Sequence, residues 1–358
     1  MSLAVTVLKN SAVLLLFLLF ISCGTKNKEY ANNVFPYSQF PQEKELKGEV
    51  IELDTALFRY PFRIRIEGDK AIVLDLHGSD YYGHLFQYPS FRYLSSFGRR
   101  GDSPLEMLSM ENFRLHNHTL WTLDANKSEL TRLDFSSSGD SLLREETVAL
   151  DEDILRPLDF AIYNDTTFVI PDYSGESRFL KVDCKGKLIE KIGTIPTTNK
   201  KALQEARPAL AQAWRSFLDY NSHNSVLATV TQLGEVVEIY NLKDSTHVIR
   251  VGEYDEPEFK VSDGYGIPTG IMGFSDVQVT DDAIYAVFHG TSFKDIARQS
   301  GRLPDGGKYI YVFCLKGEPL CKYVLDHYIY GIWVDEVTKT IMATDVNNDQ
   351  PILKFSFG

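Results

Sequence analysis

Short apolar runs recur along the chain, and a polar turn precedes each of them. Six runs of this kind occupy residues 71–76, 120–124, 167–172, 225–230, 283–288 and 340–345. The second residues of successive runs lie 49, 47, 58, 58 and 57 positions apart. The shorter spacings are typical of a four-stranded propeller blade, which takes roughly 40–50 residues. The pattern therefore predicts six repeats, the later ones enlarged by insertions.

Each repeat contains strand-like segments joined by tight turns. Apolar and polar residues alternate in RIRIEGD at 63–69 and in EVVEIY at 235–240, which is the period of a half-buried strand. Asn, Asp and Gly stand at the turns, where they supply hairpin geometry. A strand-like segment precedes and another follows every apolar run, and a fourth segment completes five of the six repeats. Five repeats thus have the four strands of a complete blade.

The sixth repeat shows three strands before the sequence ends at Gly358. A further strand-like segment, GEVIELD at 48–54, stands before the first repeat. Placing it as the outer strand of the last blade closes the ring and removes an open edge, which would invite aggregation. The sequence therefore predicts an all-β fold over residues 48–358. We expect a six-bladed β-propeller of four-stranded blades, with the N-terminal strand completing the last one.

Three longer segments interrupt the repeats. Residues 200–218 are rich in helix formers and predict a short helical insertion, broken near Pro208. Residues 292–307 lie between the second and third strands of the fifth repeat. Residues 257–271, rich in Gly and Pro, predict a long loop between the fourth and fifth repeats. The first two insertions should project from one rim or the other of the ring.

The N-terminus has the pattern of an export signal. Residues 12–21 form an unbroken apolar run of ten, whereas a membrane-spanning helix needs about 20. The run leads into Ser22-Cys23, which resembles the bacterial lipobox, where the cysteine receives a diacylglycerol. We expect a signal peptide at residues 1–22, a lipid on Cys23 and a polar tether at 23–47. The alternative is a soluble secreted protein cut near Ser22.

Size and charge limit the classes of partner. Cleavage before Cys23 leaves 336 residues with a net charge of −13, because Lys9 is the only charged side chain removed. A strongly acidic chain repels nucleic-acid phosphates and is not held electrostatically by anionic lipids. We therefore expect no nucleic acid, and membrane attachment only through the N-terminal lipid.

Two cysteines face each other across an expected hairpin. Cys314 and Cys321 lie in two apolar runs on either side of a turn at 316–319. Opposite residues on neighbouring strands can reach disulfide geometry, and an oxidising compartment would permit the bond. Two free thiols are an equally good interpretation, and Cys184 has no evident partner in the sequence.

Residues 96–107, SFGRRGDSPLEM, carry a recognisable signature between the first and second repeats. The segment resembles the G-R-x-G-x-x-P-x-E motif of TolB-like six-bladed propellers, which are abundant as lipoproteins in Bacteroidetes. The matching residues are Gly98, Arg99, Gly101, Pro104 and Glu106, while Leu105 stands where family members usually have a second glycine. The resemblance covers nearly the whole mature chain. It implies the fold and says little about activity.

The sequence contains no local catalytic signature. HExxH, GxSxG, CxxC and glycine-rich phosphate loops are all missing. His116 and His118 are better explained as a turn than as metal ligands. The segment at 345–349 starts like a calcium loop but lacks the later glycine and glutamate. We therefore expect no cofactor and no metal.

A few residues remain candidates for ligand binding. Arg99 and Arg100 could hold a carboxylate or sulfate with their guanidinium forks, although a structural role between blades is favoured for Arg99. Trp214, Tyr220 and His223 lie beside the helical insertion and are expected on a rim. Most other aromatic residues should fill the wedges between blades.

Two functions compete at this point. The favoured one is a non-catalytic binding or scaffold protein of the cell envelope that recognises a peptide, a glycan or another envelope protein. The alternative is a hydrolase or lyase with its site at the central channel, which three convergent acidic or histidine side chains would support. Gly24 after the lipidated cysteine, without a nearby acidic cluster, favours the outer membrane and its periplasmic leaflet by resemblance.

Overall fold

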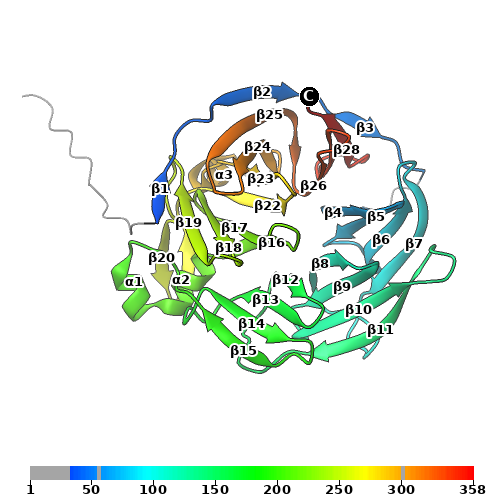
Figure 1. Ribbon diagram of the computed structural model, residues 1–358, viewed down its shortest axis with the longest axis horizontal. Helices are drawn as coiled ribbons and strands as arrows, with labels where there is room; N and C mark the ends of the chain where they lie inside the picture. The colour runs from blue at the N-terminus through cyan, green and yellow to red at the C-terminus, as the bar shows by residue number, and fades with distance from the viewer. Residues whose placement is uncertain (1–32, 55–57, 300–302) are drawn as a thin grey trace, which may run out of the picture. The chain divides into compact units, whose positions relative to one another are not determined.

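The computed structural model describes residues 33–54, 58–299 and 303–358. Residues 32–358 belong to one compact unit, which is described here by itself. Its strands form six blades arranged in a ring, each built on four antiparallel strands, and one separate two-stranded hairpin (Figure 1). Blade I contains β4 (Pro61–Glu67), β5 (Lys70–Asp75), β6 (Tyr81–Gln87) and β7 (Arg92–Arg99). Blade II contains β8 (Met110–His116), β9 (Thr119–Asp124), β10 (Glu129–Phe135) and β11 (Leu142–Ala149).

The remaining blades follow in chain order. Blade III contains β12 (Ala161–Asn164), β13 (Thr167–Pro171), β14 (Phe179–Asp183) and β15 (Leu188–Ile192). Blade IV contains β16 (Ser216–Asn221), β17 (Val226–Thr231), β18 (Val236–Asn241) and β19 (Thr246–Val251). Blade V contains β22 (Phe274–Val279), β23 (Ala283–Phe288), β24 (Gly307–Cys314) and β25 (Pro319–Ile329). Blade VI contains β26 (Ile332–Asp335), β27 (Thr340–Thr344), β28 (Ile352–Ser356) and β3 (Glu49–Ile51).

The first strand of every blade faces the axis of the ring. Neighbouring first strands contact one another all the way round, from β4 and β8 to β26 and β4. The predicted closure is confirmed, because β3 pairs antiparallel with β28 and completes blade VI. Burying this edge satisfies backbone groups that would otherwise stay unpaired.

Part of the segment predicted as a tether, residues 34–46, contributes two strands to the ring. Residues 34–36 form β1 (Val34–Pro36), which pairs in parallel with β19, and residues 42–46 form β2 (Gln42–Leu46), which pairs in parallel with β25. Blades IV and V thus each gain a fifth, outer strand. The apolar and aromatic residues of the segment 34–40 explain the error, because they pack against the ring instead of remaining in solvent. The predicted signal peptide, Cys23 and residues 24–32 lie outside the described residues.

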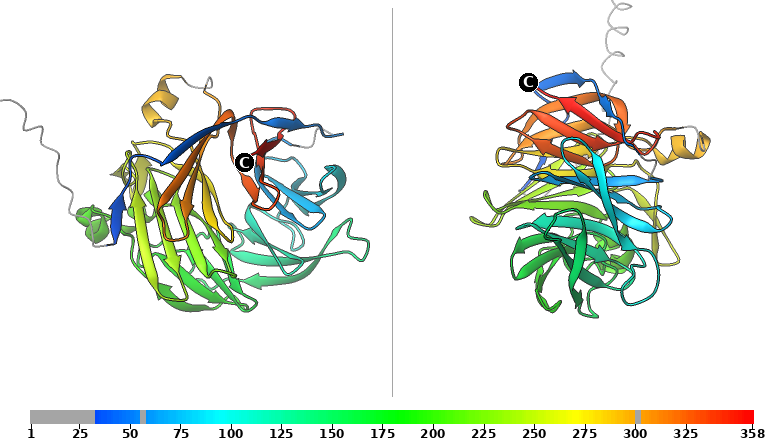
Figure 2. Two further views of the ribbon diagram at one scale, coloured as in Figure 1. Left: turned by 45° about the horizontal axis from the view of Figure 1, so that its top comes forward. Right: turned by 90° about the vertical axis from the view of Figure 1, so that its right-hand side faces the viewer.

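All three insertions leave the same face of the ring, named here the insertion face. The predicted helical segment forms α1 (Lys200–Glu205) and α2 (Arg207–Ala213), separated at Ala206, with Pro208 in the first turn of α2. Residues 257–271 form a hairpin of β20 (Phe259–Ser262) and β21 (Tyr265–Pro268), where we had expected a loop. α3 (Phe293–Arg298) joins β23 to β24 and stands off the ring in the edge-on view (Figure 2).

Topology places these insertions on one face. Within a blade the strands alternate in direction, so loops that enter a first strand and loops between second and third strands emerge at the same end. The helices α1 and α2 precede β16, and the hairpin precedes β22. The helix α3 lies between the second and third strands of blade V. The opposite face carries the short turns of the hairpins.

Aromatic side chains fill the wedges between blades, as expected from the sequence. Trp121 and Phe168 join blades II and III, with ring centroids 5.0 Å apart. Tyr163 and Tyr220 join blades III and IV at 5.3 Å. Aromatic contacts of this kind add to the stabilisation from the area that each large ring buries.

Candidate functional site: the central channel and the insertion face

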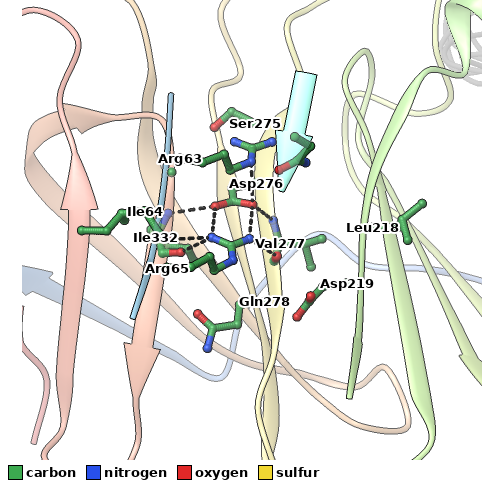
Figure 3. Close-up of polar contacts among 12 residues, drawn as sticks. Arg63, Ile64, Arg65, Leu218, Asp219, Ser275, Asp276, Val277, Gln278 and Ile332 are labelled. Carbon is green, nitrogen blue, oxygen red and sulfur yellow. Dashed lines mark hydrogen bonds and ion pairs between the residues drawn. The ribbon is translucent and has the colours of Figure 1, made fainter. Parts of the chain in front are cut away.

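Arginine and aspartate side chains fill the middle of the ring. Arg65 on β4 forms two hydrogen bonds of 3.0 Å to the carboxylate of Asp276 on β22. The Nε atom of Arg63 lies 3.3 Å from the same carboxylate. Asp276 also accepts hydrogen bonds from the backbone N–H groups of Val277 and Ile332. Figure 3 shows Asp276 between the two guanidinium groups, so blade I is tied to blade V across blade VI.

Burial and charge set the protonation of this cluster. Burial opposes ionisation of Asp276, yet Arg63 and Arg65 together hold its pKa below the usual value. Burial lowers the pKa of Arg63 to about 10, against the attraction of Asp276. Burial also acts to lower the pKa of Arg65, but Asp276 outweighs it and raises that pKa. The three groups therefore carry their charges at neutral pH and stabilise one another.

A second cross-link joins blades II, III and IV. Arg114 on β8 donates hydrogen bonds of 2.7 Å to the carboxylate of Asp159 and to the carbonyl of Leu218. Asn112 donates to the same oxygen of Asp159 at 2.7 Å. The other oxygen of Asp159 accepts the backbone N–H of Leu218 at 3.0 Å. The side chains of the first strands thus bond the backbone of the next blade.

A cavity of about 250 Å³ lies at the end of the channel opposite the insertion face. Its lining residues are Arg65, Ile66, Glu67, Arg114, Leu115, Asp219, Gln278, Val279 and Trp333. Asp219 on β16 accepts the backbone N–H of Val279 at 2.8 Å. Burial raises the pKa of Asp219, although Arg114 and Arg65 act to lower it. Among the described groups of the channel, Asp219 both lines this cavity and has a raised pKa.

Four described carboxylates therefore lie in or beside the channel, because Glu67 lines the same cavity as Asp219. Asp159 and Asp276 are ion-paired with arginines and bonded to backbone N–H groups, which hold them in place. Asp219 and Glu67 have no described arginine within ion-pair distance, and they are the acidic groups on which the alternative of an enzyme rests.

Buried aspartates also mark the ends of the second strands on the insertion face. Asp124 accepts backbone N–H groups from Leu108, Ser109, Asn126 and Lys127 at 2.7 to 3.2 Å. Blades I, III and VI have a buried aspartate at the same end of the second strand, namely Asp75, Asp172 and Asp345. Sequence analysis missed this role, although the runs AIVLDL, LWTLD, TFVIPD and TIMATD each contain the aspartate. The repetition of that residue was the available signal.

The family-like signature lies between blades I and II, where its side chains contact one another and the neighbouring strands. An added Cβ at Gly101 would lie 1.9 Å from Oε2 of Glu106, so the glycine leaves room for that carboxylate. Arg99 reaches Glu106 at 3.5 Å and remains 70% exposed. Arg100 donates to the carbonyl of Leu76, and its guanidinium lies 3.8 Å from the ring centroid of Tyr82. Ligand binding by these arginines stays a prediction.

The three rim candidates do not form one site. Trp214 is buried, with 1% of its surface exposed, and packs among apolar residues beside α2. Its expected rim position is wrong because the indole fills the space between the helical insertion and blade IV. His223 is exposed on the opposite face and pairs with Asp281 at 3.1 Å. Tyr220 lies near that same end of β16, stacked obliquely on Tyr163.

Both cysteines of the expected hairpin are free thiols. Cys321 stands opposite Val312, and Cys314 stands opposite Ala283 on the other neighbouring strand. An irregularity after Val312 shifts the register, so the two sulfur atoms do not face each other. The prediction of a disulfide between Cys314 and Cys321 is therefore wrong, and the alternative of two free thiols holds.

The expected turn at the two histidines is present. Asn117 and His118 both have a positive φ, at 49° and 58°, and connect β8 to β9. His116 pairs with Asp165 at 2.8 Å. Within the described ranges, no three His, Cys, Asp or Glu side chains are arranged to hold a metal ion. In the same ranges no helix is long and apolar enough to cross a membrane.

Exposed apolar side chains gather on segments of the insertion face. The hairpin β20–β21 exposes Val261, Tyr265 and Ile267 by 53%, 60% and 48%. Further residues of these segments are Tyr81, Leu105, Leu108, Leu155, Tyr254 and Ile296. Exposed apolar residues that share one element, such as the three on the hairpin, are candidates for an interaction site.

Comparisons with known proteins agree with this architecture. A family model described as TolB-like 6-blade propeller-like matches residues 39–337. A putative exported protein from Bacteroides fragilis shares 12% identity, with a TM-score of 0.55 over 90% of this chain and 98% of that one. A member of the DUF4221 family from Bacteroides vulgatus shares 11%, with a TM-score of 0.54 over 88% and 98%.

A third solved structure is an auxiliary nutrient binding protein from Bacteroides ovatus. It shares 10% identity, with a TM-score of 0.52 over 84% of this chain and 70% of that one. No curated protein matches the chain. At these identities the solved structures establish likeness of fold alone.

Proposed function

Because the chain belongs to the TolB-like family of six-bladed propellers, we propose that it is a lipid-anchored binding or scaffold protein of the cell envelope. Its partner would be a peptide, a glycan or another envelope protein. The observation that carries this proposal is the contrast between the two parts of the ring. Paired charges cross-link the channel, while the insertion face exposes apolar side chains on added structure.

Several facts support recognition by the insertion face. The hairpin β20–β21 packs against α2, so its exposed residues are held on a supported element. Tyr265 combines a large apolar ring with a polar tip, which suits interfaces. The exported protein and the nutrient binding protein of Bacteroides share the fold and are consistent with a role outside the cytoplasm.

The anchor is the second part of the proposal. Cys23 would carry the lipid, and residues 23–32 would form the tether before β1 begins at Val34. One acyl chain alone gives weak membrane attachment, whereas several chains give stable attachment. We favour the outer membrane and its periplasmic leaflet.

Fractionation of cells tests the anchor. The native chain should label with a radioactive fatty acid and sediment with membranes, and Cys23→Ala should do neither. Cys184→Ala serves as the control, because it removes a cysteine from the propeller and leaves the proposed anchor. Membrane retention of Cys23→Ala would contradict the lipid attachment.

Crosslinking in the native envelope, followed by affinity capture, tests the binding role. A partner captured by the native chain should be lost when Tyr265 is replaced by Ala. The alternative of a hydrolase or lyase rests on Asp219, whose pKa is raised beside a cavity. Turnover of a panel of glycans or lactones that disappears in Asp219→Asn would replace the binding proposal by that alternative.

A further inference from the structure

A cavity of about 330 Å³ lies where the N-terminal segment crosses from blade IV to blade V. The segment 37–40 connects β1 to β2 and forms one wall. The end of β19 and the strands β24 and β25 form the others. The lining residues are Tyr37, Ser38, Gln39, Phe40, Glu43, Glu235, Glu253, Tyr254, Tyr311 and Lys322.

Aromatic rings line much of this cavity. The ring of Phe40 lies 4.7 Å from that of Tyr311, and Tyr37 packs edge-on against Phe40 at 5.6 Å. Tyr311 is held from behind by Phe288, whose ring is stacked on it at 4.7 Å. Tyr254 is 49% exposed and stands at the open side. Ring packing therefore holds the cavity wall in place near blade V, while solvent reaches the cavity beside Tyr254.

Glu235 is a buried carboxylate in this wall, with 3% of its surface exposed. It accepts the backbone N–H of Tyr254 at 3.1 Å. An added Cβ at Gly252 would lie 2.0 Å from Cδ of Glu235, so the chain leaves room for this carboxylate. No described basic side chain lies within ion-pair distance of it, and Glu253 lies close enough to repel it.

The one basic residue of the lining is already engaged. Lys322 forms an ion pair of 2.9 Å with Glu43, and its ammonium lies 4.8 Å from the ring centroid of Tyr309. The hydroxyl of Tyr37 is buried beside Glu235, close enough to stabilise the charge of that carboxylate. The cavity thus combines a surplus of negative charge with aromatic faces and a buried polar group.

We infer that this cavity binds a cationic group of an organic ligand, an alkylammonium or a guanidinium, between Glu235, Glu253 and the rings of Tyr254 and Tyr311. Aromatic faces attract cations, and the attraction grows when the cation leaves water. A buried carboxylate is costly until a cation approaches it. The inference deepens the proposed binding function, on which it rests, by naming a chemical group of the ligand.

A purely structural role for Glu235 would require only a hydrogen-bond acceptor and no charge. A side chain that only holds the loop at Tyr254 needs one acceptor oxygen, and glutamine supplies that oxygen without a charge. Burial raises the pKa of Glu235, with help from Glu253 and against the N–H of Tyr254 and the hydroxyl of Tyr37. Cation affinity should therefore increase as the pH rises through this raised value.

Titration of the mature chain with Nα-acetyl-lysine methylamide, followed by NMR or calorimetry at low ionic strength, tests the inference. Glu235→Gln should weaken binding by about tenfold or more, because a charge-assisted hydrogen bond is lost. Glu45→Gln, on the exposed face of β2, is the matched control for net charge and should bind as the native chain does. Tyr254→Phe should bind normally, whereas Tyr254→Ala should bind more weakly.

Two outcomes would overturn the inference. One is equal binding of the Nε-acetylated probe, which has no charge. The other is unchanged binding by Glu235→Gln with an unchanged unfolding midpoint. Butylammonium binding as tightly as the lysine probe identifies a small amine as the source, and tighter binding of the lysine probe identifies a peptide side chain. Failure here leaves partner capture through Tyr265 intact, so the two proposals fail separately.

Discussion

Blades IV and V differ from the other four blades in three ways. They gain the outer parallel strands β1 and β2, and they border or contain every helix described. They also lack the buried aspartate at the end of the second strand, where the strand register places Thr231 and Phe288. Blades I, II, III and VI keep four strands and the aspartate.

The comparison separates a scaffold from a specialised region. The aspartates of the plain blades bond backbone N–H groups of loops on the insertion face, and this bonding is called the aspartate clamp here. The insertions enter or interrupt blades IV and V, which lack the clamp. The outer strands β1 and β2 pair with the same two blades.

The largest effect should come from the bonds that hold the specialised blades to the rest. Among the described residues, Asp276 is the only carboxylate within ion-pair distance of the buried Arg63 and Arg65, and Asp276→Ala removes it. Breaking a buried pair on one side costs about 3–5 kcal/mol of unfolding free energy. Urea denaturation of the mature chain measures the loss. Asp219→Ala, in the neighbouring blade, should cost about 1–2 kcal/mol, because one backbone hydrogen bond is lost.

Equal losses for these two variants would show that the arginines of blade I do not depend on Asp276. The channel would then not be the connection between the plain and the specialised blades. Asp276→Asn keeps an acceptor for the backbone N–H of Ile332 and removes the charge. Its loss should lie between those of the two alanine variants.

The second largest loss of unfolding free energy should come from removing an aspartate clamp. Asp124→Ala leaves four backbone N–H groups without their acceptor, which should cost about 2–3 kcal/mol. Thr231 occupies the equivalent position in blade IV, and its hydroxyl accepts only the N–H of Val236, at 3.3 Å. Thr231→Ala should cost about 1 kcal/mol. Denaturant midpoints with unchanged slopes would give both values, and a larger loss for Thr231 would reverse the comparison.

Two buried histidines, His289 beside the end of β23 in blade V and His84 on β6 in blade I, make stability depend on pH. Burial lowers the pKa of His289 to about 3, and burial lowers that of His84 in blade I to about 4. Both imidazoles are neutral in the folded chain, while the unfolded chain binds protons below about pH 6.5. Stability is therefore full above that pH and falls as the pH decreases. Each histidine contributes up to about 1.4 kcal/mol per pH unit.

His289→Gln and His84→Gln should each reduce the slope of stability against pH between pH 6 and 5. Thermal unfolding at several pH values measures the slope. The pair Arg178–Glu238 contributes at lower pH, because Arg178 holds the pKa of buried Glu238 at about 2 despite the cost of burial. That contribution is lost only as the pH falls from about 4.5 toward 2. A slope that is unchanged in His289→Gln would assign it to other groups.

The sequence predicted the ring, its six repeats and its closure by residues 48–54, because apolar period and turn residues are local signals. It did not predict the bonds of the channel. Arg63 and Arg65 alternate with isoleucines in β4, so their common face was visible, but their partner Asp276 lies more than 200 residues away. The pairing depends on the closed ring and not on any local pattern.

Errors at the edges have a similar cause. The polar stretch that follows Cys23 predicts a tether up to residue 47, whereas residues 34–46 pair in parallel with β19 and β25, which only the folded ring provides. Trp214 was placed on a rim because it follows a helical segment, and its burial depends on how that segment packs. The cavity at Glu235 joins segments from residues 37 to 322, a distance that a single sequence does not reveal.

Substitutions in the exposed hairpin should change stability least and partner binding most. Ile267 in the hairpin β20–β21 and Ile189 on β15 are exposed by 48% and 54%, so each buries a similar part of its side chain. Replacement of either by Ala should change the unfolding free energy by no more than about 0.5 kcal/mol. Only Ile267→Ala should reduce the amount of partner captured by crosslinking from the envelope, because Ile189 belongs to a plain blade. Equal capture by both variants would mean that the hairpin is not the recognition surface, and the distinction between the two regions would then be one of structure alone.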